Sequence, residues 1–257
     1  MQVDRLPIGL LLLPSLRSLA YLSVMKELGV APQEVVLMNV SIPELDAVRT
    51  EGRQYHYKEQ FFDVDLDIHQ TLVDWGCVTH MVSTGSANDP QVHAALDQCE
   101  STQIVFTGGG ILSKETLSRG KTFIHAHPGY LPEFRGSTCF YYSLLTDLSL
   151  AATVFFMEEK IDTGQIIARQ RFRMNYQVEK SQPLFVDYIL DPYIRAETLK
   201  KALVQYIKEG LFEQKPQPLA ARPTYYVMHP LLRHLAINRV NQHYNQDEPI
   251  GVFLDED

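Results

Sequence analysis

The sequence predicts an α/β protein in which a mostly parallel, twisted sheet carries helices on both faces. The apolar runs at residues 8–13 and 35–40 have the length and composition of fully buried strands. Between them, apolar residues recur at helical spacing over residues 16–28, and Gly29 follows where such a helix would end. A helix between two apolar strands is a βαβ unit, which implies a parallel sheet covered on both sides.

Similar patterns continue along the chain. They predict strands at residues 80–83, 103–106, 123–124, 151–157 and 165–172, and helices at 90–99, 113–119, 137–145 and 196–210. The connection between the last two strands is so short that it predicts an antiparallel hairpin. Past Pro216 the composition shifts to Pro, Tyr, His and Asn, which predicts a strand at 225–230 and a helix at 231–237. We therefore expect one domain over residues 1–210 and a small C-terminal appendage over 211–257.

Composition narrows the class of protein. The 257 residues are 45% hydrophobic and 21% charged, as in ordinary soluble globular proteins. The formal net charge is −8 and no run of Lys or Arg exceeds a pair, so no nucleic-acid partner is expected. The three cysteines form no CxxC pair, which signals neither disulfides nor a zinc cage and favours the cytoplasm. The first apolar run is too short to span a membrane.

An acidic stretch invites a metal-site interpretation. Asp63, Asp65, Asp67 and His69 alternate with aliphatic residues. Period-two alternation favours a solvated face of an extended segment over a metal site, and no calcium-type loop glycine is present. Asp67 is expected to cap a helix that ends near Trp75. No metal is therefore expected.

The candidate active site follows the strand at residues 123–124. The apolar run leads into His125 and His127, which share a face because alternate residues of a strand do so. Asp162 lies downstream, in a turn between two apolar stretches. Before these, Gly108, Gly109 and Gly110 follow a strand, where backbone amides can approach a ligand closely. Their spacing matches neither GxGxxG nor a P-loop, so a plain glycine turn is an alternative.

Two motifs carry a family resemblance. HPGYLPEFRG at residues 127–136 and IDTGQII at 161–167 resemble the formyltransferases that use N10-formyltetrahydrofolate. The resemblance covers roughly residues 80–172 and implies a Rossmann-like sheet with that folate as cofactor. By resemblance, His127 is the catalytic oxyanion donor and proton-transfer group, and Asp162 orients it. The resemblance also implies that the pterin lies between Gly108, Gly109, Gly110, Ile111 and Leu112 on one side and Glu158, Glu159, Lys160 and Ile161 on the other.

The sequence departs from the family pattern at two positions. The family carries asparagine two residues before the catalytic histidine, where this chain has His125. A histidine serves as an oxyanion donor only through a neutral N–H or as imidazolium, whereas an amide donates in any protonation state. Phe155 stands where many members carry histidine, and we interpret it as core or pocket wall. His125 is therefore the third candidate catalytic residue.

Together, the motifs and the composition predict formyl transfer to a small-molecule amine, with a nucleotide-linked amino sugar as the preferred acceptor. Hydrolysis of formyltetrahydrofolate, or transfer of another one-carbon or acyl group, is an alternative on the same scaffold. A non-catalytic ligand-binding homologue is a second alternative. A homodimer contact through the residues beyond Pro216 is also left open.

Overall fold

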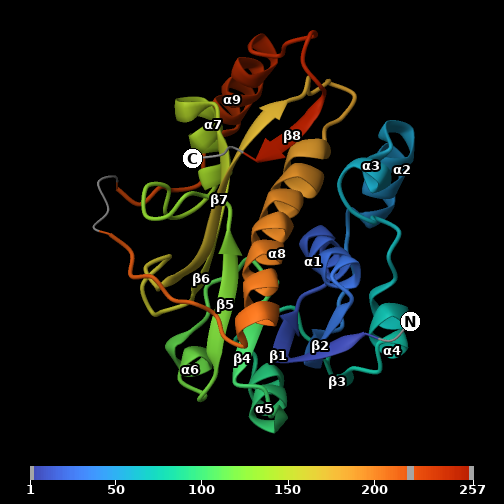
Figure 1. Ribbon diagram of the computed structural model, residues 1–257, viewed down its shortest axis with the longest axis vertical. Helices are drawn as coiled ribbons and strands as arrows, with labels where there is room; N and C mark the ends of the chain where they lie inside the picture. The colour runs from blue at the N-terminus through green and yellow to red at the C-terminus, as the bar shows by residue number, and fades with distance from the viewer. Residues whose placement is uncertain (1–2, 219–222, 255–257) are drawn as a thin grey trace.

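An eight-stranded sheet runs through the computed structural model, which describes residues 3–218 and 223–254 (Figure 1). The strands lie in the order β3-β2-β1-β4-β5-β6-β7-β8. Their bounds are β1 (Asp4–Leu12), β2 (Val30–Met38), β3 (Val78–Val82), β4 (Gln103–Phe106), β5 (Thr122–His127), β6 (Leu150–Phe156), β7 (Ile166–Asn175) and β8 (Gly251–Leu254). The strands predicted up to residue 172 are present, and several extend beyond their predicted bounds.

Pairing changes direction halfway across the sheet. The five strands from β3 to β5 pair in parallel, whereas β5–β6, β6–β7 and β7–β8 are antiparallel. The predicted hairpin is therefore confirmed. Because β1 lies between β2 and β4, consecutive crossovers leave in opposite directions there. Such a switch point opens a crevice at the carboxyl ends of the strands, where α/β proteins bind ligands.

Helices cover both faces of the sheet, as predicted. Helix α1 (Leu16–Glu27) packs against α8 (Asp191–Glu209) on one face, and α5 (Pro90–Gln98) covers β2 and β3 on the other. The other helices are α2 (Leu45–Tyr55), α3 (Tyr57–Gln60), α4 (Ile68–Asp74), α6 (Lys114–Leu117), α7 (Cys139–Asp147), the π-helical turn η1 (Val186–Leu190) and α9 (Pro230–Gln242). None of the helices in the described ranges is both long and apolar enough to cross a membrane.

Alternation along the strands produces two cores. Leu10, Leu12, Val35 and Leu37 belong to the core under α1 and α8, and their neighbours face the other way. The neighbours pack with residues of α5, in a smaller core that contains Leu11, Val36, Met38, Leu96 and Ile104. A strand buried on both faces must be apolar at consecutive positions, which is why the runs in the sequence were continuous.

The acidic stretch is not an extended segment, which corrects that part of the prediction. A turn precedes α4, and the Asp67 carboxylate accepts a hydrogen bond of 2.9 Å from the Gln70 amide as its N-cap. The burial pattern is nevertheless the expected one, because Val64 and Leu66 are buried while Asp65 is exposed. The predicted capping role of Asp67 is confirmed.

The C-terminal region contains α9 as predicted, but its strand lies elsewhere. Residues 225–230 contain one isolated bridge, from Tyr225 to Gly136, in place of the predicted strand. The regular strand is β8, which pairs with β7 and joins the main sheet. The missed signal is weak because β8 is only four residues long and follows a polar loop. The division of the chain at residue 210 stays a prediction.

Candidate active site

A cavity of about 510 Å³ opens beside the carboxyl ends of β4 and β5. The loops that follow β4, β5 and β6 line it, together with Arg17, Arg195 and residues 224–227. Gly108 instead lines a smaller adjoining cavity of about 230 Å³. The predicted site residues that meet in the larger cavity are His125, His127, Asp162, Gly109, Gly110, Ile111, Leu112, Glu158, Glu159, Lys160 and Ile161.

Strand β5 delivers both histidines to this cavity. His125 and His127 are 9% and 3% exposed, and both line the cavity. Ala126 between them belongs to the core on the opposite face of the sheet. The predicted sharing of a face is therefore confirmed, and the alternation of the strand explains it.

His127 lies between two acceptors. Its Nε2 atom is 2.8 Å from the Phe134 carbonyl oxygen, and its Nδ1 atom is 3.5 Å from Asp162 Oδ2. A carbonyl oxygen only accepts, so Nε2 carries a proton and donates it. Burial lowers the pKa of His127 from its ordinary value, while the Asp162 carboxylate and the Phe134 carbonyl oppose that shift. The imidazolium is the form in which both ring N–H groups have an acceptor.

The turn between β6 and β7 fixes Asp162. Its Oδ2 atom accepts a hydrogen bond of 2.9 Å from the Gly136 amide, and its backbone has a φ of 54°. Gln217 closes the turn from the C-terminal region, because its Nε2 atom donates to the carbonyl oxygens of Asp162 and Gly164 at 3.0 and 2.7 Å. The Gly136 amide therefore holds the carboxylate, and the Gln217 side chain holds the turn, without any contribution from His127.

His125 presents an acceptor to the cavity. Its Nδ1 atom lies 3.2 Å from the Phe106 carbonyl oxygen, so Nδ1 carries the proton and Nε2 of the neutral ring is unprotonated. Burial, followed by the charges of Arg17 and Arg195, lowers the pKa of His125 well below 6.5. Phe155 is 1% exposed, lines the cavity and meets the His125 ring edge to face at 6.2 Å. Its interpretation as pocket wall is confirmed.

Two arginines at the cavity were missed by sequence reasoning. Arg17 Nη1 donates to the Gly108 carbonyl oxygen at 2.8 Å, and its buried Nε atom has no hydrogen-bond partner. Burial, followed by the charge of Arg195, lowers the pKa of Arg17 to about 10, which still leaves it cationic. Arg195 bonds to Asp191 at 3.0 Å and to the Ala126 carbonyl oxygen at 2.8 Å. These cations stabilise negative charge near neutral imidazoles.

Comparison with known proteins identifies relatives. The sequence profile described as formyl transferase matches residues 51–182, slightly more than half of the chain. A methionyl-tRNA formyltransferase from Finegoldia magna is 27% identical over 101 residues, which are 38% of this chain and 33% of the relative. The matched segment therefore spans only about a third of that curated relative.

Solved structures share the fold. A sugar N-formyltransferase from Shewanella sp. matches with a TM-score of 0.50 and 14% identity, over 98% of this chain and 92% of that one. A phosphoribosylglycinamide formyltransferase from Anaplasma phagocytophilum matches with a TM-score of 0.54 and 15% identity, over 88% of this chain and 100% of that one. At these identities the likeness is one of fold alone.

Gly164 tests how tightly the Asp162 turn is built. A Cβ atom at Gly164 would lie 1.6 Å from the Phe156 carbonyl oxygen, so Gly164→Ala must displace the turn. We expect a loss of about 1–3 kcal/mol in the free energy of unfolding, as for other overpacked sites. Gly85→Ala is the matched control, because its Cβ would meet Val40 at an ordinary 3.7 Å. Chemical denaturation measures both, and equal stabilities would contradict the tight turn.

Proposed function

The chain belongs to the formyl transferase family, and from this premise we propose that it transfers a formyl group from N10-formyltetrahydrofolate to the amine of a small molecule. The observation that carries the proposal is the pairing of His127 with Asp162, at 3.5 Å, inside the cavity. Formyl transfer needs a group that takes up the proton lost by the amine and donors for the developing oxyanion.

The glycine loop and the β6–β7 turn fit a planar donor. A Cβ atom at Gly110 would meet nothing within 4 Å, and one at Gly109 would meet only the Arg17 guanidinium. Backbone amides and carbonyls are therefore accessible to a heteroaromatic edge. Leu112, Phe155 and Met157 supply apolar lining, and the volume of about 510 Å³ is in the range of ligand sites. When bound, the folate supplies the formyl carbon that the amine attacks.

The His127–Asp162 pair accepts the proton that the amine loses, and the same pair would return it to the folate nitrogen as the bond from that nitrogen to the formyl carbon breaks. Protonation of Nδ1 gives His127 an N–H that faces Asp162, while the Nε2 N–H already faces the Phe134 carbonyl oxygen. Asp162 thus stabilises the imidazolium as it forms. The fixed turn holds the carboxylate at this position before the reaction, so little reorganisation is needed.

His125 has a different role from the amide of the family pattern. Its unprotonated Nε2 atom accepts a hydrogen bond from the attacking amine and orients the nitrogen lone pair. It does not donate to the oxyanion in this tautomer, so the negative charge is stabilised by the buried Arg17 and Arg195. Arg17 and Arg195 are among the charges that lower the pKa of His125.

For the acceptor we propose an amino sugar linked to a nucleotide. The sugar N-formyltransferase from Shewanella sp. has the same fold over nearly the whole chain. Tyr226 lines the cavity and is 83% exposed, so its ring is available to stack on a sugar or a base. Tyr130, Tyr141 and Tyr142 lie outside the residues that line the cavity.

The direct test is an assay with N10-formyltetrahydrofolate and a panel of amines that includes nucleotide-linked amino sugars. We expect a formylated amine by mass spectrometry and release of tetrahydrofolate in equal amount. Folate release without a formylated amine would indicate hydrolysis and overturn the transfer proposal. Failure to bind a folate analogue in calorimetry would indicate a non-catalytic homologue. Formylation of a non-sugar amine would overturn the acceptor class alone.

Asp162→Asn separates catalysis from folding. Asparagine keeps an oxygen that can accept the Gly136 amide hydrogen bond but loses the charge that stabilises the imidazolium. We expect kcat to fall by about 10²–10⁴-fold, the usual contribution of acid–base catalysis, with unchanged affinity for a folate analogue. Asp74→Asn, on the exposed side of α4, is the control and should retain full activity. Retained kcat in Asp162→Asn would refute the assigned role.

His125→Asn tests the acceptor role and the pH dependence. The shorter asparagine side chain cannot place its amide oxygen where the ring Nε2 lies, so kcat/KM should fall by about tenfold, equivalent to one hydrogen bond of about 1.4 kcal/mol. The lowered pKa values keep both imidazoles neutral near pH 7, so activity should fall only below pH 6.5, as they become protonated. This acid limb should persist in His125→Asn, because His127 remains. Equal or higher kcat/KM in the variant would show that His125 is not an acceptor for the amine.

A further inference from the structure

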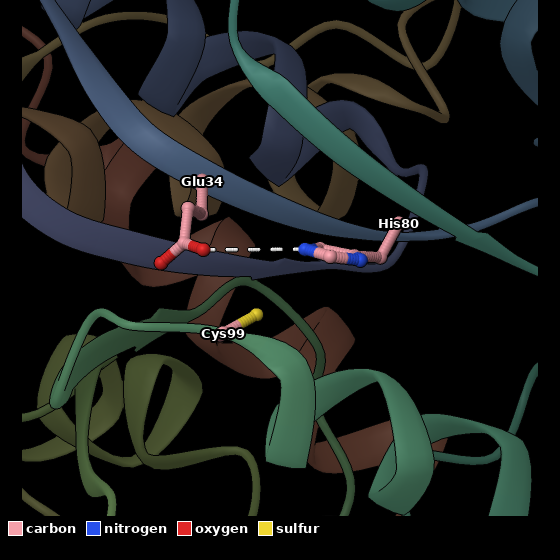
Figure 2. A group of neighbouring side chains, drawn as sticks. All are labelled: Glu34, His80 and Cys99. Atoms are coloured by element: carbon pink, nitrogen blue, oxygen red, sulfur yellow. Dashed lines mark ion pairs between the residues drawn. The ribbon is translucent and has the colours of Figure 1, made fainter.

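A second group of polar side chains lies away from the cavity, on the sheet face that α5 covers. Glu34 comes from β2, His80 from β3, and Cys99 from the end of α5 (Figure 2). One oxygen, one ring nitrogen and the sulfur lie within 4.8 Å of one another. The cluster therefore joins an inner strand, an edge strand and the connection between α5 and β4.

Glu34 is rigidly held and still has coordination capacity. Its Oε1 atom accepts the Glu100 amide at 3.1 Å, and its Oε2 atom accepts the Ser101 amide at 2.7 Å. Each carboxylate oxygen has two acceptor positions, so one remains on each. Burial alone would raise the pKa of Glu34, but the Ser101 amide and hydroxyl, the Glu100 amide and the nearby His80 lower it, which keeps the group ionised. Amide donors of this kind orient metal-binding carboxylates.

His80 has a ring nitrogen that nothing in the described residues satisfies. Its Nε2 atom is buried without a hydrogen-bond partner and lies 4.0 Å from Glu34 Oε1, too far for a hydrogen bond. An unsatisfied buried polar atom costs about 1–3 kcal/mol, so such an atom calls for a partner. The ring side chain is 20% exposed, which leaves a route for a small ion and a water molecule.

Cys99 supplies a soft third donor. Its thiol is buried and makes a weak 3.3 Å contact with the Ala95 carbonyl oxygen. Burial and the neighbouring Glu34 raise the pKa of Cys99 to about 11, so it is a thiol in the free protein. A bound dication reverses this balance and deprotonates a coordinating thiol. The ammonium of Lys121, which bonds to the Cys99 carbonyl oxygen, also favours the thiolate.

We propose that Glu34, His80 and Cys99 bind one zinc ion, with water in the fourth position. Carboxylate, neutral imidazole and thiolate together carry two negative charges, which Zn²⁺ neutralises in a buried setting. The thiolate and imidazole favour zinc over magnesium or calcium. Tetrahedral zinc with bonds of about 2.0–2.3 Å needs ligand atoms about 3.5 Å apart, so a contraction of about 1 Å completes the site.

The proposed ion has a structural role. It ties the edge strand β3 to β2 and to the loop that feeds β4, remote from the histidines of the cavity. The cysteine pattern gave no zinc signal because the ligands are separated by 46 and 19 positions and are brought together only by the sheet. A zinc ion that binds the folded chain but not the unfolded chain raises the free energy of unfolding.

The test uses the full chain, stripped of metal by a chelator and titrated with ZnCl₂ in a calorimeter. We expect one Zn²⁺ per chain and a higher Tm in its presence. Cobalt(II) in place of zinc should produce the near-ultraviolet charge-transfer band of a thiolate–cobalt bond. Surface histidines cannot produce that band, so it reports a cysteine ligand, which the Cys99→Ser and Cys77→Ser variants then identify. Absence of both stoichiometric binding and the band would overturn the proposal.

Matched variants identify the ligands. Cys99→Ser and His80→Gln should each weaken zinc binding by about tenfold or more, since even outer-shell changes have effects of that size. Cys99→Ser should also abolish the cobalt band. Cys77→Ser, at the half-buried cysteine that precedes β3, and His69→Gln, at an exposed histidine, should bind as the unaltered chain does. Full binding in both ligand variants, or an equal loss in the controls, would refute the assignment.

Discussion

The change from parallel to antiparallel pairing at β5 is the constraint on which the site depends. One neighbour of β5 is the parallel strand β4, whose loop supplies the glycines, and the other is the antiparallel strand β6. The β6–β7 connection returns Asp162 to within 3.5 Å of His127. A wholly parallel sheet would need a long crossover at this point, with no short turn beside the histidines. The sheet topology thus brings an imidazole and a carboxylate together across 35 positions of sequence.

The parts of the site that depend on neighbouring residues in the chain could be predicted from the sequence. The strand that carries His125 and His127, the glycine loop and the Asp162 turn were all visible as apolar runs ended by polar or glycine residues. Arg17 and Arg195 were not, because their importance comes from contacts with carbonyl groups 91 and 69 positions away. The Glu34, His80 and Cys99 cluster was hidden for the same reason. Long-range proximity has no periodic signature in a single sequence.

The charge distribution at the cavity also escapes sequence analysis. The chain is acidic overall, with a net charge of −8, yet two guanidinium groups lie at the cavity beside two buried imidazoles. The cations are held mainly by backbone carbonyl oxygens and Asp191. The local potential is therefore set by which charges lie together, whereas net charge sums over the whole chain and does not report the potential at one site.

Tyr225 contacts the loop that follows β5, so the cavity is lined partly by loops of the main sheet and partly by the C-terminal region. Tyr225 forms a β-bridge with Gly136, and its ring stacks on Phe134 with the ring centroids 5.7 Å apart. The segment after residue 223 therefore packs against the loop that follows β5. His125 and His127 belong to β5 and Asp162 to the β6–β7 turn, whereas this wall belongs to the C-terminal region. Substitutions in residues 224–227 can therefore reshape one wall of the cavity without altering the strand and the turn that carry His127 and Asp162.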